Sequence, residues 1–205
     1  MPETWLPGAT RALTPNRYPA GHRYVAPVEI LVLHYTAGRT ARSAVDWLTN
    51  PEAKASAHLV VGHDGTDGPS GDLYQLAPLE DRTWHAGGPT SRWRGGVVNS
   101  RSIGIEIVNM GPLTPGRGGG YRDWTGQVFG GPVFLDPAGK AWEAYPPAQL
   151  ARVKALIATL VAMFPILAVV DAKPGELGRI CGHQDVDPTR KQDPGPAFPW
   201  RSILS

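Results

Sequence analysis

Two histidines and one aspartate have the residue types and positions of metal ligands. His34 ends the apolar run that begins at Val28, and His183 follows a second short apolar run. Asp193 lies ten residues after His183, where Pro194-Gly195 can fix a turn that directs its carboxylate back. A catalytic zinc ion needs three such ligands and one open position. Taken alone, residues this far apart also fit structural side chains at strand ends, so the spacing leaves both interpretations open.

Two segments have the pattern of buried strands that could carry such residues. Residues 28–34 are short, apolar and rich in β-branched side chains. Alternate residues of a strand share a face, so His34 should emerge where this strand ends. Residues 103–108 alternate cleanly, with three isoleucines toward the core and Gly104 and Glu106 on the opposite face. We therefore expect Glu106 to project from the non-core face of its strand.

The remaining elements predict an α/β (α+β) fold with a central mixed β-sheet flanked by helices. Thr40 can cap a short helix that ends before Asn50-Pro51, and a longer helix should begin at Pro146-Pro147. Residues 58–61 and 73–76 read as strands joined by a long Gly- and Asp-rich hairpin connection at 62–71. We expect one domain, with three parts: an N-terminal arm at 1–27, a catalytic domain at 28–205, and an insertion at 111–145 within it.

Composition excludes several classes of protein. A net charge of +2, with scattered basic residues, does not indicate a nucleic-acid partner. The single cysteine, Cys181, excludes an internal disulfide framework and a cysteine-based zinc knuckle, and it reads as a small buried hydrophobe. No apolar run reaches membrane-spanning length and no signal peptide is visible. We therefore expect no membrane span and a chain that is cytoplasmic as made. We also expect a monomer.

Several motifs occur together in one order along the chain. They are His34-Tyr-Thr-Ala-Gly38, Ser56-Ala-His58, Trp84-His-Ala-Gly87, Asn99-Ser-Arg-Ser-Ile-Gly-Ile-Glu106 and Pro188-Thr-Arg-Lys-Gln-Asp-Pro-Gly-Pro-Ala-Phe198. The sequence thereby resembles the type-2 N-acetylmuramoyl-L-alanine amidases, a family that includes bacterial recycling and envelope amidases, phage lysozyme-type amidases and peptidoglycan recognition proteins. The matching segments span roughly residues 28–110 and 145–200, and the last motif is the most specific.

The resemblance implies a role for ten residues. Zn²⁺ would be held by His34, His183 and Asp193, and the catalytic residues would be Glu106 and Lys191. Residues in the shared motifs that are candidates for substrate binding are Tyr35, Trp84, His85, Ala86 and Asn99. Phage lysozyme-type members carry a tyrosine where this chain has Ala57, so a mechanism assisted by that tyrosine is excluded.

The implied reaction is hydrolysis of the amide bond between the lactyl group of N-acetylmuramic acid and L-alanine, with peptidoglycan or muropeptides as partners. Glu106 would take the proton of the attacking water, and Lys191 would stabilise the oxyanion. The chain could act on the cell wall after release, as a phage-type endolysin does, or in wall turnover. Two alternatives stay open: a non-catalytic peptidoglycan-binding module, and a zinc peptidase that cuts within the stem peptide.

The roles of some other side chains are less specific. His85 either contacts the substrate peptide or hydrogen-bonds a loop, whereas His58 and His63 read as structural. Asp185 and Arg190 are expected to brace the ligand loop. The aromatic residues of the 111–145 insertion could form a stacking wall for sugar or peptide, or an apolar lid over the core, and the lid is the favoured reading.

Overall fold

The computed structural model describes residues 3–63, 73–87, 98–168 and 178–205. Within these residues the helices are α1 (Ala41–Leu48), α2 (Pro147–Met163), α3 (His183–Val186) and α4 (Trp200–Leu204), with short 3-10 helices at Pro51–Ala53, Val98–Ser100 and Pro165–Ala168. The strands of the first half are β1 (Thr10–Arg11), β2 (Arg17–Tyr18), β3 (Ile30–Tyr35), β4 (Leu59–Val61), β5 (Leu73–Gln75) and β6 (Arg82–Thr83). Those of the second half are β7 (Ser102–Ile107), β8 (Thr114–Pro115), β9 (Tyr121–Arg122), β10 (Val128–Phe129), β11 (Val133–Leu135), β12 (Ala141–Glu143) and β13 (Ile180–Gly182).

A central mixed sheet organises the domain, as the sequence predicts. Its strand order is β1-β5-β4-β7-β3-β13. The pairs β4–β7, β7–β3 and β3–β13 are parallel, whereas β4 and β5 pair antiparallel. The predicted hairpin partners are therefore confirmed, while most of the connection at 62–71 lies outside the described residues.

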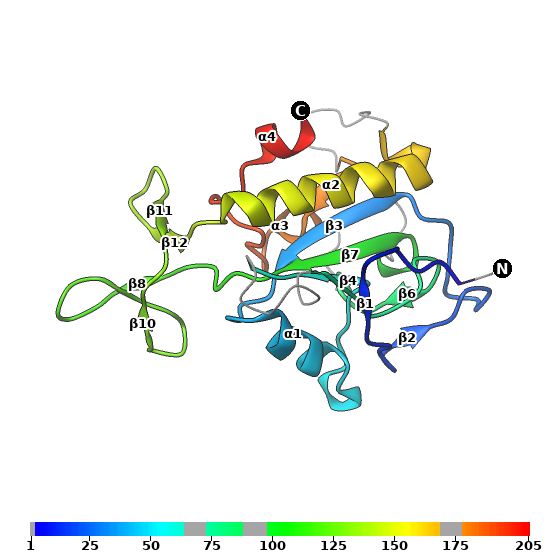
Figure 1. Ribbon diagram of the computed structural model, residues 1–205, viewed down its shortest axis with the longest axis horizontal. Helices are drawn as coiled ribbons and strands as arrows, with labels where there is room; N and C mark the ends of the chain where they lie inside the picture. The colour runs from blue at the N-terminus through cyan, green and yellow to red at the C-terminus, as the bar shows by residue number, and fades with distance from the viewer. Residues whose placement is uncertain (1–2, 64–72, 88–97, 169–177) are drawn as a thin grey trace.

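Both faces of the sheet are covered, which explains why β3 is an uninterrupted apolar run. Residues 30–33 have no exposed surface, as expected for a parallel strand buried on both sides. Leu31 and Leu33 pack with α2 in the main core. Ile30 and Val32 face the other way, against Cys181 and Val186. Figure 1 shows α2 on one side of the sheet and α1 on the other.

The two main helices begin where the sequence predicts. The hydroxyl of Thr40 accepts a hydrogen bond from the backbone N–H of Ser43 at the start of α1. Pro147 occupies the first turn of α2, where a missing N–H costs nothing. Val153 and Leu160 of α2 are fully buried against the sheet, and each such side chain contributes about 1.5–3 kcal/mol.

The N-terminal segment, which the sequence predicts as an arm lying over the domain, also contributes a strand to the sheet. Thr10 of β1 pairs in parallel with Tyr74 of β5, so residues 10–11 form the sheet's edge strand. Farther back, the backbone N–H of Leu6 donates to the side-chain oxygen of Gln75 at 2.7 Å, and Leu6 is buried in the main core. A two-residue strand is too short to show a period, so the sequence does not reveal it.

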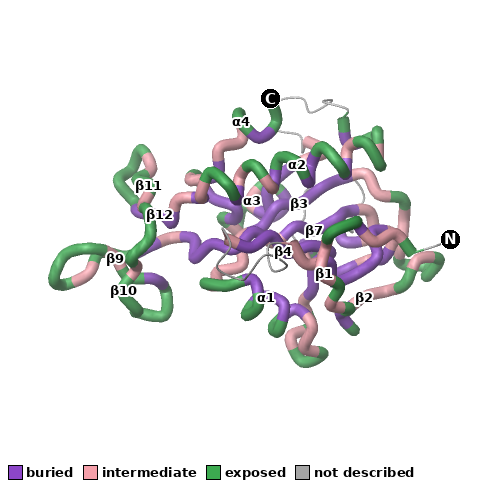
Figure 2. The backbone as a smooth tube through the Cα atoms, in the orientation of Figure 1, coloured by how far each residue is buried: buried purple, intermediate pink, exposed green. Residues whose placement is uncertain are grey.

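The insertion does not form a lid over the core, contrary to the favoured reading. Strands β8 to β12 project from the body of the domain (Figure 1), and most of this projection is exposed (Figure 2). It has a small apolar cluster of its own, formed by Met110, Leu113 and Ala141. Its end rejoins the body, where Trp142 and Tyr145 are buried. Among the described residues, no helix combines the length and apolar composition needed to cross a membrane.

Candidate active site

The register of three parallel strands brings the predicted site residues together. His34 lies opposite Glu106 in the pairing of β3 with β7. Gly182 lies opposite Leu33 in the pairing of β13 with β3, so His183, the next residue, follows beside His34. The carboxyl ends of parallel strands meet at one edge of a sheet, where open α/β folds place their sites. Asp193 reaches this point from the loop after α3.

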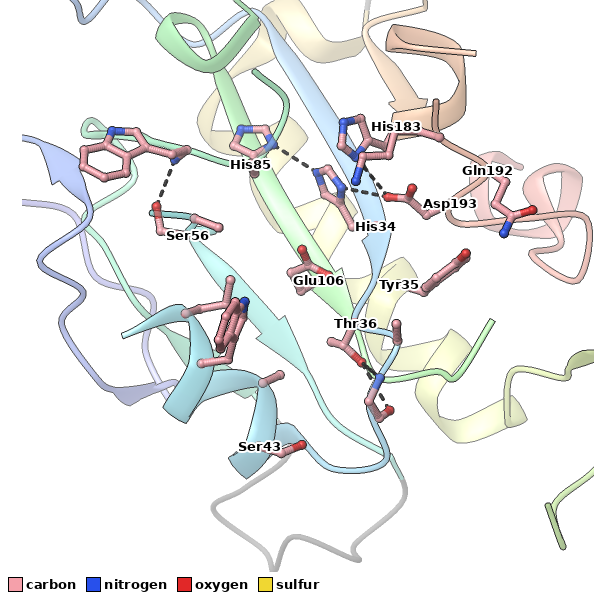
Figure 3. A pocket seen from close by; sticks show the side chains of 18 of the residues that line it. His34, Tyr35, Thr36, Ser43, Ser56, His85, Glu106, His183, Gln192 and Asp193 are labelled. Atoms are coloured by element: carbon pink, nitrogen blue, oxygen red, sulfur yellow. Dashed lines mark hydrogen bonds and ion pairs between the residues drawn. The ribbon is translucent and has the colours of Figure 1, made fainter. Parts of the chain in front are cut away.

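Three predicted ligands converge at this edge of the sheet (Figure 3). Oδ2 of Asp193 lies 2.9 Å from Nδ1 of His34 and 3.1 Å from Nδ1 of His183. The two imidazole rings are 4.5 Å apart between centroids and cross at 75°. All three residues are buried, with exposed fractions of 2%, 3% and 7% for His34, His183 and Asp193.

The charge states of His183 and Asp193 match those of metal ligands. Burial lowers the pKa of His183 to about 4, so its imidazole is neutral at pH 7. Burial also raises the pKa of Asp193, but the adjacent His183 and His34 nitrogens outweigh that effect and hold the pKa well below its usual range. A neutral imidazole and an ionised carboxylate are the forms that bind a metal ion.

This donor set could hold a metal ion. Its three ligand atoms lie within 4.8 Å of one another, and two nitrogens with one carboxylate oxygen form a common ligand set of catalytic zinc, which keeps a fourth position open. Tetrahedral ligands about 2.0–2.1 Å from zinc are separated by roughly 3.3 Å. The observed nitrogen–oxygen separations of 2.9 and 3.1 Å are close to that value.

The loop that carries Asp193 is fixed by contacts on both sides. The backbone N–H of Gln184 donates to the carbonyl of Asp193 at 2.9 Å. The hydroxyl of Tyr145 donates to the carbonyl of Pro194 at 2.8 Å. Gly182 allows this approach, because a Cβ there would lie 2.5 Å from Cδ of Pro194. Packing between β13, the end of the insertion and this loop therefore sets the position of the carboxylate.

The predicted bracing residues are within hydrogen-bond distance of this region. Asp185 accepts a hydrogen bond from the backbone N–H of Gly182 at 2.8 Å. Arg190 pairs with Asp187, Nε to Oδ2 at 2.9 Å, and also reaches the carbonyl of Gly87 at 3.3 Å. These contacts link the ligand loop to α3 and to the segment that carries His85.

Glu106 has the environment of a proton carrier. Its Oε2 is enclosed and has no hydrogen-bond partner among the described residues. Burial raises the pKa of Glu106 to about 7, although nearby His34 lowers it. A carboxylate with a pKa near the working pH can both take up and release a proton, which is what general acid–base catalysis requires. Lys191 lines the same pocket.

The trio and Glu106 open into a pocket of about 440 Å³, a size suited to a small ligand or a segment of a polymer. Of the five residues predicted to bind substrate, Tyr35, Trp84 and His85 line it. Trp47 of α1, which is 59% exposed, also lines it. The indole of Trp84 lies 5.8 Å from the ring of Tyr18 between centroids, and its enclosed Nε1 has no partner among the described residues.

Ala86 and Asn99, also predicted to bind substrate, are not among the residues that line this pocket, and their role in binding stays a prediction. Both are buried. Oδ1 of Asn99 accepts hydrogen bonds from the backbone N–H groups of Ala86 at 2.6 Å and His85 at 3.2 Å. These residues hold the loop that carries His85, because the amide side chain satisfies two backbone donors of that loop.

Two residues of β7 support the site in roles that the sequence does not assign to them. Ser102 Oγ lies 2.9 Å from Nε2 of His85. Gly104 leaves room for that imidazole, because a Cβ there would lie 2.4 Å from its Cγ. The two-residue period offered a signal for both, since it places Ser102, Gly104 and Glu106 on one face of β7.

Comparison with known proteins agrees with this geometry. The family described as N-acetylmuramoyl-L-alanine amidase matches residues 24–196, which include every residue of the site. The chain belongs to that family. AmiD, the N-acetylmuramoyl-L-alanine amidase of Escherichia coli, is 31% identical over 177 residues, which cover 86% of this chain and 52% of AmiD. AmpD of Escherichia coli, named 1,6-anhydro-N-acetylmuramyl-L-alanine amidase, is 26% identical across 98% of this chain and 92% of AmpD. The chain spans about half the length of several of these curated relatives.

Two solved structures share the fold. AmiD from Escherichia coli, in complex with the substrate anhydro-N-acetylmuramic acid-L-Ala-D-gamma-Glu-L-Lys, superposes with a TM-score of 0.58 at 27% identity. That match covers 90% of this chain and 59% of AmiD. AMPDH3 from Pseudomonas aeruginosa, in complex with an anhydromuramic pentapeptide, gives 0.60 at 31% identity, covering 94% of this chain and 64% of that one.

Proposed function

We propose that this domain is a zinc-dependent amidase that hydrolyses the bond between the lactyl group of N-acetylmuramic acid and L-alanine in peptidoglycan or in muropeptides derived from it. One observation carries the proposal: a buried His34–His183–Asp193 trio opens into the same pocket as Glu106, an enclosed carboxylate with a raised pKa. Membership of the amidase family supports the same activity.

Zn²⁺ is the metal that the donor set favours, because imidazole nitrogens with one carboxylate and an open fourth position are typical of catalytic zinc. Bound by His34, His183 and Asp193, it would polarise the amide carbonyl and lower the pKa of water toward about 7. The neutral His183 and the ionised Asp193 need no change of protonation to act as ligands.

Glu106 moves the proton in this proposal. Its carboxylate takes a proton from the attacking water, and then passes it to the nitrogen of L-alanine as the amide bond breaks. The enclosure of Oε2 keeps bulk water from competing for that proton. The ammonium of Lys191, at the same pocket, stabilises the negative oxygen that develops on the carbonyl carbon. Together these residues supply acyl-transfer chemistry.

The pocket wall supplies positions for the substrate. Exposed Trp47 offers a ring face for a sugar or an apolar side chain. The Nε1 of Trp124, in the projecting insertion, donates to the carbonyl of Ala37 at the pocket rim. This contact supports the insertion as a wall that extends the site.

A digest of purified cell wall by the zinc-loaded protein tests the proposal. We expect new amino groups, all on L-alanine, and glycan strands of unchanged length. New reducing ends would refute the assignment, because glycosidic cleavage needs two carboxylates about 5–9 Å apart around the sugar. New amino groups on other residues would favour a zinc peptidase, and binding without products would favour a non-catalytic module. A parallel digest of anhydro-muropeptides shows whether the domain acts on polymeric wall, as an endolysin does, or on recycled fragments.

A further inference from the structure

A line of hydrogen bonds runs from the ligand His34 away from the site and into the protein. Nε2 of His34 lies 3.0 Å from Nδ1 of His85. Nε2 of His85 lies 2.9 Å from Oγ of Ser102, and that hydroxyl lies 2.7 Å from the carbonyl oxygen of Val98. In Figure 3, dashed lines join His85 to His34, and His34 to Asp193.

The last link gives the whole line a direction. A carbonyl can only accept, so the single hydroxyl proton of Ser102 lies on its bond to Val98. Oγ of Ser102 must then accept from His85, which places the proton of that imidazole on Nε2. Nδ1 of His85 is left as an acceptor, so the proton of His34 must lie on its Nε2.

We propose that Ser102 and His85 are positioning residues that fix the tautomer of His34, with its proton on Nε2 and the lone pair of Nδ1 directed at the metal. The inference rests on the proposed zinc site. Metal-ligating histidines commonly donate their second ring nitrogen to a partner that fixes the ring. Here the partner is a second imidazole, whose own orientation is set by a serine and a backbone carbonyl.

The contacts of its ring and of its backbone hold His85 in this role. Nδ1 of the ring lies 3.0 Å from Nε2 of His34, and Nε2 of the ring lies 2.9 Å from Oγ of Ser102. Its backbone N–H is held by Asn99 at 3.2 Å. Gly104 leaves the space that the ring occupies. Both ring nitrogens are therefore used inside the protein, and neither is free for a substrate peptide.

The direction also explains the contact between His34 and Asp193. With its proton on Nε2, His34 presents a lone pair to a carboxylate oxygen 2.9 Å away. Two acceptors at that distance repel each other unless a cation lies between them. With this tautomer, a cation between His34 and Asp193 is needed to offset the repulsion. In the other tautomer, Nδ1 of His34 would donate its proton to Asp193 and could not bind the metal.

His58 provides a matched internal control. It is also buried, its Nε2 lies 2.9 Å from the carbonyl of Asp81, and its Nδ1 lies 3.0 Å from the hydroxyl of Thr83. Like His85, it has a hydroxyl group within hydrogen-bond distance of one ring nitrogen. The centroids of the His58 and His85 rings are 6.0 Å apart. It makes no contact with a ligand nitrogen among the described residues. Thr83→Val therefore removes a comparable buried hydroxyl without touching the line to His34.

The first experiment needs no variant. Long-range ¹H–¹⁵N correlation spectra of ¹⁵N-histidine-labelled protein report which nitrogen of each ring carries the proton. In the zinc-loaded wild-type protein we expect His85 to be protonated at Nε2 and not at Nδ1, and His34 at Nε2. A proton on Nδ1 of His85 would reverse the line and overturn the proposal.

The second experiment measures Zn²⁺ affinity by competition with a chelator. Ser102→Ala frees the proton of His85 to move to Nδ1, so we expect that tautomer to appear and the affinity to fall about 10- to 100-fold. Ser102→Thr keeps the hydroxyl and should restore both readouts, and Thr83→Val should change neither. Unchanged affinity and an unchanged His85 spectrum in Ser102→Ala would overturn the proposal. If the wild type bound no Zn²⁺ at all, the proposed zinc chemistry would fail instead, and the two failures are distinguishable.

Discussion

Glu106→Gln should separate chemistry from metal binding, because the amide keeps the shape of the carboxylate but cannot accept a proton. Glu106 is not one of the three converging ligands, so the variant should bind Zn²⁺ as the wild type does. Its kcat/KM should fall by about 10²- to 10⁴-fold, the usual worth of a positioned general base. At 1.36 kcal/mol for each factor of ten, that loss corresponds to about 3–5 kcal/mol of transition-state stabilisation.

The same substitution should stabilise the zinc-free protein at neutral and alkaline pH. Burial raises the pKa of Glu106 from 4.5 to about 7, so the folded state holds this proton more tightly than the unfolded state. Wild-type stability therefore falls as the pH rises from about 4.5 to 7, by roughly 3 kcal/mol at 1.36 kcal/mol for each tenfold change in acidity. Glutamine carries no such charge. The difference in Tm between the variant and the wild type should therefore be roughly 6–12 °C larger at pH 8 than at pH 4.

Two measurements check this reasoning. Turnover of a muropeptide by the zinc-loaded proteins, with bound zinc determined by mass spectrometry, tests the catalytic role. Thermal unfolding of the zinc-free proteins at pH 4 and pH 8 tests the buried charge, since the comparison between variants cancels other titrating groups. A turnover within tenfold of wild type would show that another group moves the proton. The same difference in Tm at both pH values would show that the carboxylate is not desolvated.

The remaining predictions concern the ligands, the oxyanion and the free thiol. His34→Ala, His183→Ala and Asp193→Ala should each lose bound zinc and activity, because three ligands are the minimum for a catalytic ion; stoichiometric zinc in any one of them would exclude that residue as a ligand. Lys191→Met should keep zinc and lower kcat by about 10²-fold through loss of the charge near the oxyanion, and an equal kcat would place Lys191 outside the reaction. Cys181 should resist alkylation in the folded protein, because burial raises the pKa of its thiol well above the ordinary value; modification at the rate of an exposed thiol would contradict the burial.

The parts of the fold that the sequence predicts are those with a strong local pattern. The apolar run before His34 and the alternation around Glu106 correspond to β3 and β7, which are six residues long and buried. Their periodicity reflects direct burial in the core, so it can be read from one sequence. The start of α2 at Pro147 is equally local, because proline fits the first turn of a helix.

The parts that the sequence does not predict depend on contacts between distant segments. The edge strand β1 has two residues, so no period identifies it, and its pairing with β5 is accompanied by a hydrogen bond from the backbone N–H of Leu6 to the side chain of Gln75. The aromatic content of the insertion predicts an apolar lid over the core. Strands β8 to β10 instead pair with one another and project outward (Figure 1). Composition reports how apolar a segment is, but not which surface it packs against.

The candidate site shows the same division. The resemblance to the amidases assigns His34, His183 and Asp193, and the structure places them within ligand distance of one another. The link from His85 to Ser102 crosses 17 positions of the chain, and no local rule connects a loop histidine to a strand serine. The motif that contains Asn99 predicts a substrate contact, but it does not reveal that its side chain accepts hydrogen bonds from the backbone of His85 and Ala86.

One feature of the sheet sets the whole arrangement. His34 lies opposite Glu106 across β3 and β7, and His183 follows the residue opposite Leu33. A slip of one residue between β3 and β7 would turn Glu106 and Ser102 into the core and bring the isoleucines of β7 to the site. That slip would bury a carboxylate under α2 and expose apolar surface, both at a cost in free energy. The burial that stabilises the sheet therefore also fixes the register on which the ligands, the proton carrier and the His85–Ser102 support depend.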